Sequence, residues 1–247
     1  MILQNIKFYD TPEQAASTAA QDVFLWLAEQ KKSINIVLAT GRTPVIFYRN
    51  LIKNLETKPA LIKECFFLNL DEYVGYEPSN PYSFAYFLKQ HVIKPLGLTP
   101  EQYSFWDGAS SKMQDQIIAK EQMIQDRGGL DLVILGLGTN AHIAFNEPGT
   151  PFNSQCHLVN LSQQTLKANQ ELLDPDIEKP KQAVTMGIST ILAAKKIIVL
   201  AFGKEKIKAV QHTLMNKPSE NWPASALQSH DNCHFYFDEA IKNGLIC

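Results

Sequence analysis

Polar side chains cluster in one short segment that directly follows an apolar run, at Asn140, His142, Asn146 and Glu147. A histidine titrates near neutrality and can move a proton in either direction. A single histidine is more often structural than catalytic, but the two glycines that precede this one let a ligand approach the backbone closely. The combination therefore indicates proton-transfer chemistry at His142, with Glu147 beside it.

The same segment also matches a dinucleotide-binding fingerprint, because Gly136, Gly138 and Ala141 follow a strand with the spacing G-x-G-x-x-A. That fingerprint needs a helix directly after the glycines, whereas Pro148 and Gly149 interrupt the chain within about two turns. It also needs an acid about 20 residues further on to bind the ribose, and the run SQCHLVNLSQQ contains none. We therefore do not expect a dinucleotide to bind this loop.

Two adjacent acids, Asp71 and Glu72, directly follow the apolar run CFFLNL. Adjacent side chains do not easily point the same way, so we expect only one of them to face a cleft. A carboxylate in such a cleft can be held near the pKa that it needs to take a proton from a carbon next to a carbonyl group. A solvated acidic turn is the alternative interpretation, since acids are common in loops.

A third candidate is the loop ATGRTP, which joins an apolar strand to a helix and contains Thr40, Gly41, Arg42 and Thr43. Backbone amides at the start of a helix, together with two hydroxyls and a cation, make a good anion site. An ordinary strand-to-helix turn with a hydroxyl cap has the same composition. Both interpretations of this loop stand at this point.

The elements that must position these loops alternate between short apolar runs and longer stretches of helical period, as in repeated βα units. The pattern predicts an α/β fold with an open, mostly parallel sheet and helices on both faces. Expected strands are Ile34 to Ala39, Cys65 to Leu70, Leu130 to Leu135, Ile197 to Phe202 and Cys233 to Phe237. Expected helices run from a capping box at Thr11 to Gln30, after Pro44, after Pro81, from Ser110 to Arg127 and from Lys204 to Leu214. In such a sheet, ligands bind outside the carboxyl ends of the strands, where the three candidate loops lie.

The whole chain fits a single domain, residues 1–247, since open α/β sheets of this length commonly form one unit. Lys and Arg total 23 against 25 Asp and Glu, and without a basic run we expect no nucleic acid partner. The first residues do not resemble a signal peptide and no long apolar stretch follows, so we expect a cytoplasmic protein without a membrane partner. An oligomer is compatible with the sequence but cannot be derived from it.

Metal binding is not expected from the histidines or the cysteines. The four cysteines, at positions 65, 156, 233 and 247, form no C-x-x-C pair and are interpreted as free thiols. His230 and His234 stand four residues apart, but His234 falls in the alternating run HFYF of an expected strand, where the pair could not share one helix face. His157 is interpreted as a strand residue.

Together, the three loops resemble the glucosamine-6-phosphate deaminase family, and the resemblance covers essentially the whole chain. The runs that carry it are LATGRTP, LDEYVGY, GLGTNAHIAFNEPG, VTMGISTIL and FGKEKIKAV. The run HIAFNEP is the most specific of them. The resemblance implies a modified Rossmann-like fold and a hexosamine-6-phosphate deaminase/isomerase that needs neither a metal nor any other cofactor and turns glucosamine or galactosamine 6-phosphate into a 6-phosphoketose and ammonia.

The resemblance also implies a role for each matching residue. Asp71 is expected to take the proton from C2 of the sugar and return it at C1. His142 is expected to open the pyranose ring by passing a proton to the ring oxygen, with Glu147 tuning its charge. The loop that contains Thr40, Gly41, Arg42 and Thr43, together with Lys206, is expected to bind the 6-phosphate and align C2 with Asp71.

Two positions depart from the family pattern. Where the family usually has D-G-H, this chain has Asn140, Ala141 and His142. An Asn oxygen can accept the ring N–H and orient it, but it supplies no full charge. Relatives that act on galactosamine 6-phosphate resemble the chain in this Asn and in the run QCHLVNL, which favours the galacto epimer.

Leu166 stands about where the glucosamine enzymes have a phosphate-binding arginine. Either Lys167 next to it takes over that role, or the phosphate depends on Arg42 and Lys206. The chain also ends at Cys247, short of the tail of allosteric relatives, so we do not expect regulation by an acetylated sugar phosphate. Two alternatives remain: a 6-phosphogluconolactonase-type hydrolase, whose loop does not need Asn-Glu-Pro, and a non-catalytic sugar-phosphate sensor.

Overall fold

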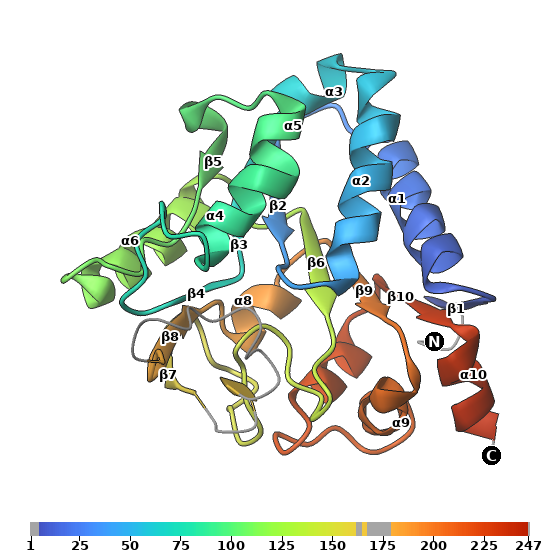
Figure 1. Ribbon diagram of the computed structural model, residues 1–247. Coiled ribbons are helices and arrows are strands. Elements are labelled where there is room, and N and C mark those ends of the chain that lie inside the picture. Colours follow the sequence, from blue (N-terminus) through green and yellow to red (C-terminus); the bar gives the residue numbers. More distant parts are fainter. Residues whose placement is uncertain (1–4, 162–164, 167–178, 247) are drawn as a thin grey trace.

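The computed structural model describes residues 5–161, 165–166 and 179–246, and its central element is a seven-stranded sheet with the order β1-β10-β9-β6-β2-β3-β5 (Figure 1). Every neighbouring pair of strands in this sheet runs parallel. The strands are β1 (Ile6–Tyr9), β2 (Ile34–Leu38), β3 (Cys65–Asn69), β5 (Tyr103–Ser104), β6 (Leu132–Gly136), β9 (Lys196–Ala201) and β10 (Cys233–Asp238). All five expected strands are therefore confirmed, with shifts of one or two residues at their ends.

Helices cover both faces of this sheet, as the alternation of runs predicts (Figure 1). One face packs against α1 (Pro12–Glu29), α2 (Thr43–Glu56) and the helical stretch formed by α4 (Phe84–Leu88), a π-helical turn (Lys89–Ile93) and α5 (Lys94–Leu96). The other packs against α6 (Met113–Asp126), α8 (Ile188–Leu192), α9 (Ile207–Leu214) and α10 (Glu239–Ile246). A short α3 (Ala60–Lys63) lies between α2 and β3, and 3-10 turns form at Pro100–Gln102, Lys204–Lys206 and Pro223–Ser229.

The central strands are mostly apolar because both of their faces are covered. In β2, Ile36 and Leu38 pack against the α1 and α2 layer, whereas Val37 packs on the opposite side with Val133. This alternation is the period of two that a strand imposes on its side chains. Burying each such side chain contributes about 1.5–3 kcal/mol, which makes the sheet a rigid base for the loops at its edge.

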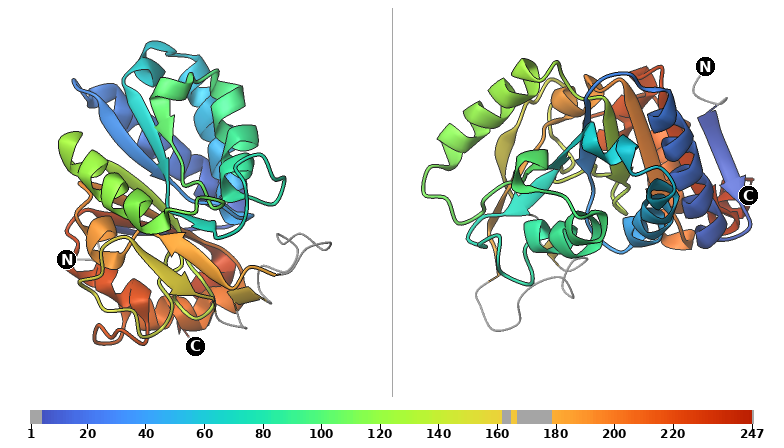
Figure 2. Two further views of the ribbon diagram at one scale, coloured as in Figure 1. Left: turned by 90° about the vertical axis from the view of Figure 1, so that its left-hand side faces the viewer. Right: turned by 90° about the horizontal axis from the view of Figure 1, so that it is seen from above.

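The first and last strands lie side by side, since β1 pairs in parallel with β10. Seen from above, β1 lies at one margin of the molecule, next to α1 (Figure 2). The helix between β1 and β2 begins as expected, because the Thr11 hydroxyl accepts a hydrogen bond from the Gln14 amide at 3.2 Å. The Gln14 side chain, however, accepts from the Asp10 amide at 3.2 Å and not from Thr11. The expected capping box is therefore displaced by one residue.

A second, smaller sheet was not predicted. It is antiparallel with the order β4-β8-β7, and comprises β4 (Asp71–Tyr73), β8 (Gln182–Thr185) and β7 (His157–Asn160). Strands of three or four residues are too short to show a period in the sequence. The interpretation of His157 as a strand residue is confirmed.

The order of the strands creates a switch point between β2 and β6. From β2 the chain builds outward through β3 and β5 on one side, and it then returns to place β6 and β9 on the other side. In an open sheet of this kind, ligands bind at the carboxyl edge near the point where the strand order reverses, which here lies between β2 and β6. No helix occurs in residues 137–156 after β6, all of which are described, which confirms that a dinucleotide crossover is absent there.

Two further findings concern the whole fold. Cys65, Cys156 and Cys233 are buried free thiols, as expected, and Cys247 lies outside the described residues. Within the described ranges, no helix is both long and apolar enough to cross a membrane.

Candidate active site

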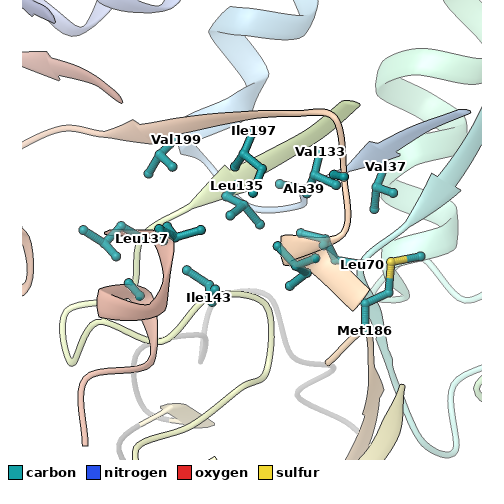
Figure 3. Close-up of a cluster of buried hydrophobic side chains, with 14 of the residues drawn as sticks. Val37, Ala39, Leu70, Val133, Leu135, Leu137, Ile143, Met186, Ile197 and Val199 are labelled. Atoms are coloured by element: carbon teal, nitrogen blue, oxygen red, sulfur yellow. The ribbon is translucent and has the colours of Figure 1, made fainter. Parts of the chain in front are cut away.

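The three candidate loops start from one buried cluster beneath the carboxyl edge of the sheet. Ala39, Leu70 and Leu137, which directly precede or begin the three loops, pack in this cluster together with Ile143 (Figure 3). Each of these side chains is at most 4% exposed. The polar residues next to them in the sequence are therefore held at the rim of a close-packed core.

The loop from residue 137 to 147 turns sharply to bring His142 back over Gly138. The Gly138 amide donates to the His142 carbonyl at 3.0 Å, and the Ala141 amide donates to the Gly138 carbonyl at 3.0 Å. A Cβ atom at Gly138 would lie 2.4 Å from the imidazole ring, so only glycine fits beneath the histidine. Ala141 and Ala144 have φ angles of 60° and 51°, a left-handed conformation that costs a non-glycine residue about 1–2 kcal/mol.

Asn140 fixes the orientation and the tautomer of His142. Its Oδ1 accepts the His142 backbone N–H at 3.2 Å and lies 2.6 Å from the ring nitrogen Nδ1. Because a backbone N–H only donates, the oxygen of the Asn140 amide must face the histidine. Nδ1 therefore carries the proton, and Nε2 is the basic nitrogen of the neutral ring.

Glu147 completes a chain of hydrogen bonds to the histidine. Its Oε2 accepts from Asn140 Nδ2 at 3.1 Å, and its Oε1 accepts from the hydroxyl of Thr165. Thr165 was not singled out in the sequence, because a threonine 18 residues away carries no signal of this contact. The structure thus links Glu147, Asn140 and His142 in series.

The charge state of His142 depends on three influences. Burial lowers the pKa of His142, the Glu147 carboxylate raises it, and the Lys206 ammonium lowers it again, with a net shift below the usual value. The structure therefore brings Lys206 close enough to act on the histidine. At neutral pH the ring is neutral, with Nε2 ready to accept a proton.

Asp71 lies at the start of β4 and is 6% exposed. Burial, followed by the charge of Glu72, raises the pKa of Asp71 well above its usual value. Among the described residues, no hydrogen bond reaches its carboxylate. A desolvated carboxylate without such bonds is a stronger base than one in water.

The environment of Glu72 differs from that of Asp71, and the difference indicates which of the two acids faces the cleft. Its carboxylate accepts backbone hydrogen bonds from Tyr73, Phe84 and Ala85 at 3.0, 2.9 and 2.8 Å. With both oxygens occupied and no exposed surface, Glu72 is committed to the fold. The expectation that only one acid is available for chemistry therefore points to Asp71.

Thr185 contacts both β4, which begins at Asp71, and the loop from residue 137 to 147, which is called the histidine loop below. Asp71 and Thr185 are directly paired across β4 and β8, so their side chains lie on the same face of the small sheet. The Thr185 hydroxyl also accepts a hydrogen bond from the Phe145 amide at 3.1 Å. Thr185 is a further residue of the site that the sequence did not reveal.

The loop after β2 borders a hollow of about 200 Å³. Thr40 and Gly41 form one side of this hollow, and the rest of its lining comes from the segment that leads into α4, namely Pro81, Tyr82, Ser83, Phe84 and Phe87. Gly41 has a φ angle of 99°, which a side chain would disfavour. Thr43 begins α2, and Arg42 is exposed beside it.

Lys206 ends the 3-10 turn that follows β9 and is half-buried. Burial lowers the pKa of Lys206, while Glu205 opposes that shift. Leu166, which stands where the resemblance places an arginine, packs in an apolar cluster with Tyr73 and Phe145. Lys167 lies outside the described residues.

The remaining histidines do not form a site. His234 lies in β10 as expected, with Nε2 2.8 Å from Asn232 Oδ1, and His230 Nε2 lies 2.7 Å from the Ala194 carbonyl oxygen. Within the described part of the chain, no group of three or more His, Cys, Asp or Glu residues could hold a metal ion.

Known proteins resemble this chain over nearly its whole length. The glucosamine-6-phosphate deaminase of Bacillus pumilus is 38% identical over 234 residues, which cover 95% of this chain and 97% of the relative. The deaminase of Staphylococcus saprophyticus is 36% identical, with 93% and 95% covered.

Solved structures agree with these relatives. A monomeric glucosamine-6-phosphate deaminase matches with a TM-score of 0.91 at 33% identity and covers 97% of this chain and 99% of its own. A 6-phosphogluconolactonase from Trypanosoma brucei shares the fold, with a TM-score of 0.79 at 19% identity and 98% of both chains covered. The family model described as glucosamine-6-phosphate isomerases/6-phosphogluconolactonase matches residues 10–235, and this chain belongs to that family.

Proposed function

We propose that the chain is a hexosamine-6-phosphate deaminase/isomerase that converts glucosamine 6-phosphate to the 6-phosphoketose and ammonia. The observation that carries the proposal is the hydrogen-bonded series Glu147, Asn140 and His142 in a fold that also buries Asp71 at the same edge of the sheet. Successive proton transfers need such poised acids and bases. The relatives with 38% and 36% identity carry the name of this activity.

The first step is the opening of the pyranose ring. Nε2 of neutral His142 takes the proton of the C1 hydroxyl and delivers it to the ring oxygen, so that the C1–O5 bond breaks and an aldehyde forms. Asn140 holds the ring by Nδ1 during the transfer, and the Glu147 carboxylate stabilises the transient positive charge through the Asn140 amide.

The second step moves a proton from C2 to C1. The Asp71 carboxylate takes the C2 proton, the electron pair of the C2–H bond forms the C1=C2 double bond, and the aldehyde oxygen takes a proton from the neighbouring C2 ammonium group, which gives a neutral enolamine. The protonated Asp71 carboxyl group then returns its proton to C1, and the nitrogen lone pair forms the C=N bond of an iminium at C2. Water adds to the iminium, and loss of ammonia gives the ketone. A carboxylate with a raised pKa suits this role, since it both accepts and returns the proton near neutral pH.

The phosphate end of the substrate is proposed to bind the loop after β2 together with Lys206. Thr40, Gly41 and Thr43 supply hydroxyls and backbone amides at the start of α2, and Arg42 and Lys206 supply positive charge. A fixed phosphate aligns the reacting carbons with Asp71 and His142.

The choice of epimer rests on different evidence for each sugar. Both deaminase relatives named above are called glucosamine-6-phosphate deaminases, which supports the gluco substrate. The preference for galactosamine 6-phosphate that Asn140 suggests stays a prediction. Recognition at C4 depends on one or two side chains in the cleft, so only a direct comparison decides it.

The test is ammonia release by the purified protein, without added metal or nicotinamide, from each of the two amino-sugar phosphates in parallel. We expect release from at least one of them, with Asp71→Asn as the inactive control. Release from neither sugar, combined with hydrolysis of 6-phosphogluconolactone, would replace the deaminase by the lactonase alternative. Binding of the sugars without turnover of any kind would favour the sensor.

A further inference from the structure

The proposed reaction steps do not involve the buried carboxylate of Glu72. It lies next to Asp71 in β4, has no exposed surface, and pairs with Val184 of β8. Burying a carboxylate is costly unless hydrogen bonds replace its hydration. Here three backbone amides do so, at 3.0, 2.9 and 2.8 Å from its two oxygens.

Two of these amides belong to the first turn of α4. Phe84 and Ala85 would otherwise lack acceptors, as the first amides of any helix do. The Ser83 hydroxyl satisfies the next amide in the chain, that of Tyr86, at 3.0 Å. Glu72 and Ser83 together therefore fix where this helix begins relative to β4.

The beginning of α4 is also a wall of the hollow beside the loop after β2, to which the substrate phosphate is proposed to bind and which is here called the substrate hollow. Ser83 and Phe84 line the hollow opposite Thr40 and Gly41. A displacement of the helix start would therefore change the width of the hollow, while Asp71 would stay with its strand. The Glu72 carboxylate is a direct link between the base and this wall.

The packing around Glu72 leaves little freedom. A Cβ atom at Gly108 would lie 2.1 Å from the Tyr73 carbonyl and 3.1 Å from Cγ of Glu72, so the chain at Gly108 closely covers this strand. The ring of Tyr73 contacts those of Phe84 and Phe145, with centroids 4.7 and 5.3 Å apart. The strand of the base, the helix start and the histidine loop are thus joined by one aromatic cluster.

We propose that Glu72 is a positioning residue for the deaminase reaction: its carboxylate holds the start of α4, and with it the wall of the substrate hollow, in a fixed place relative to Asp71. The inference rests on the proposed function. Glu72 touches no reacting atom, so it acts through the helix that it holds.

A second consequence follows from its charge. Glu72 is the acid whose charge, after burial, raises the pKa of Asp71. Burial raises the pKa of Glu72 itself to about 7, the three amides oppose that shift, and the exposed Asp107 adds to it. Glu72 therefore influences both the place of the wall and the strength of the base.

Two variants weight these effects differently. Glu72→Gln removes the charge and keeps one acceptor oxygen, which can still accept from Tyr73 and Phe84, while the Ala85 amide loses its acceptor. Glu72→Asp keeps the charge but withdraws the carboxylate from Phe84 and Ala85. Glu77→Gln is the matched control, because Glu77 is an exposed acid in the loop between Glu72 and the helix. Each protein is assayed for ammonia release from glucosamine 6-phosphate as a function of pH, and for binding of sorbitol 6-phosphate, which has no carbonyl group to react.

We expect Glu72→Asp to weaken binding of sorbitol 6-phosphate and to raise KM by roughly three- to ten-fold, because a hydrogen bond to the start of α4 is lost. The acid limb of the kcat/KM profile should stay where it is in the wild type, because the charge is kept. We expect Glu72→Gln to move that limb to lower pH by roughly one unit, because a negative charge beside Asp71 is lost. Titration of the substrate is the same for all variants, so the difference between the curves reports the enzyme.

The proposal is overturned if both variants behave as Glu77→Gln does, or if both lose their near-UV circular dichroism, which would make Glu72 a purely structural residue. Failure of the proposed function is distinguishable, because wild type and Glu77→Gln would then release no ammonia. In that case, binding of sorbitol 6-phosphate still tests whether Glu72 fixes the wall: unchanged binding in Glu72→Asp overturns the proposal.

Discussion

Asn140→Asp is the substitution that best tests the hydrogen-bonded series Glu147, Asn140 and His142, because Asn and Asp side chains have the same shape. In the wild type the amide does two things at once. Its oxygen accepts from His142, at 2.6 Å from Nδ1, and its nitrogen donates to Glu147 at 3.1 Å. An introduced carboxylate can do only the first, and it adds a negative charge to each contact.

The size of the effect follows from these distances. A unit charge about 4 Å from the imidazolium contributes about 4 kcal/mol at an effective dielectric of about 20. Repulsion from the Glu147 carboxylate raises the energy of the introduced charge and reduces its effect on the ring. Opposite charges at such distances shift a pKa by about 1–3 units. We therefore expect the pKa of His142, which burial holds below its usual value, to rise by roughly one to two units.

The assay is a nuclear magnetic resonance titration of protein labelled in its histidine ring nitrogens, together with the pH dependence of kcat/KM for ammonia release. In the proposed reaction neutral His142 opens the ring, so a higher pKa of His142 moves the histidine limb of the profile to higher pH. Asn153→Asp, an exposed change of the same charge, is the control. An unchanged titration of His142 in Asn140→Asp would refute the direct contact and with it the assigned tautomer.

Three further predictions test other parts of the site and the fold. Asp71→Asn should lower kcat by at least about a thousand-fold while retaining binding of sorbitol 6-phosphate, as measured by calorimetry; near-normal turnover would remove Asp71 from the role of base. Gly138→Ala should lower kcat by at least about ten-fold with KM little changed, since a Cβ atom 2.4 Å from the imidazole must displace the ring; an unaffected kcat would show that the position of the ring is not critical. Burial lowers the pKa of Lys120 to about 8. From about pH 8 to 10.5 the folded protein therefore binds fewer protons than the unfolded chain. The free energy of unfolding should rise with pH in this range, by up to about 1.4 kcal/mol per pH unit. Urea unfolding at several pH values should show this rise in the wild type and its loss in Lys120→Met, and parallel curves would contradict it.

The large sheet could be predicted from the sequence because its central strands are mostly apolar. The run from Ile34 to Leu38 is completely buried, and such a run between turn signals has few other interpretations. The small sheet could not be predicted in the same way. β4 is three residues long, and its first two are acids whose burial depends on partners far along the chain.

The same limit applies within the site. Sequence spacing placed His142, Asn140 and Glu147 together, because all three lie in one tight loop. It could not show that Thr165 donates to Glu147, or that Thr185 lies opposite Asp71. Those contacts arise from the pairing of strands and loops that are distant in the sequence.

The distinction between the two acids illustrates the reason most clearly. Asp71 and Glu72 are equivalent as sequence, and their roles separate only because the amides of Phe84 and Ala85 return to β4. A strand sends neighbouring side chains to opposite faces. Once one acid is bound to the helix, the other must face the side of Thr185 and the histidine loop, where a base is needed.

The neutral amide of Asn140 separates the negative charge of Glu147 from the ring of His142. A carboxylate in contact with Nδ1 would stabilise the imidazolium, whereas Asn140 conveys the hydrogen bond from Glu147 without its charge. His142 is therefore held neutral by burial and by Lys206, with Glu147 acting from one residue further away. In the proposed complex the substrate phosphate binds Lys206 and compensates the positive charge that lowers the pKa of His142. The ring then accepts a proton more readily in that complex than in the free protein.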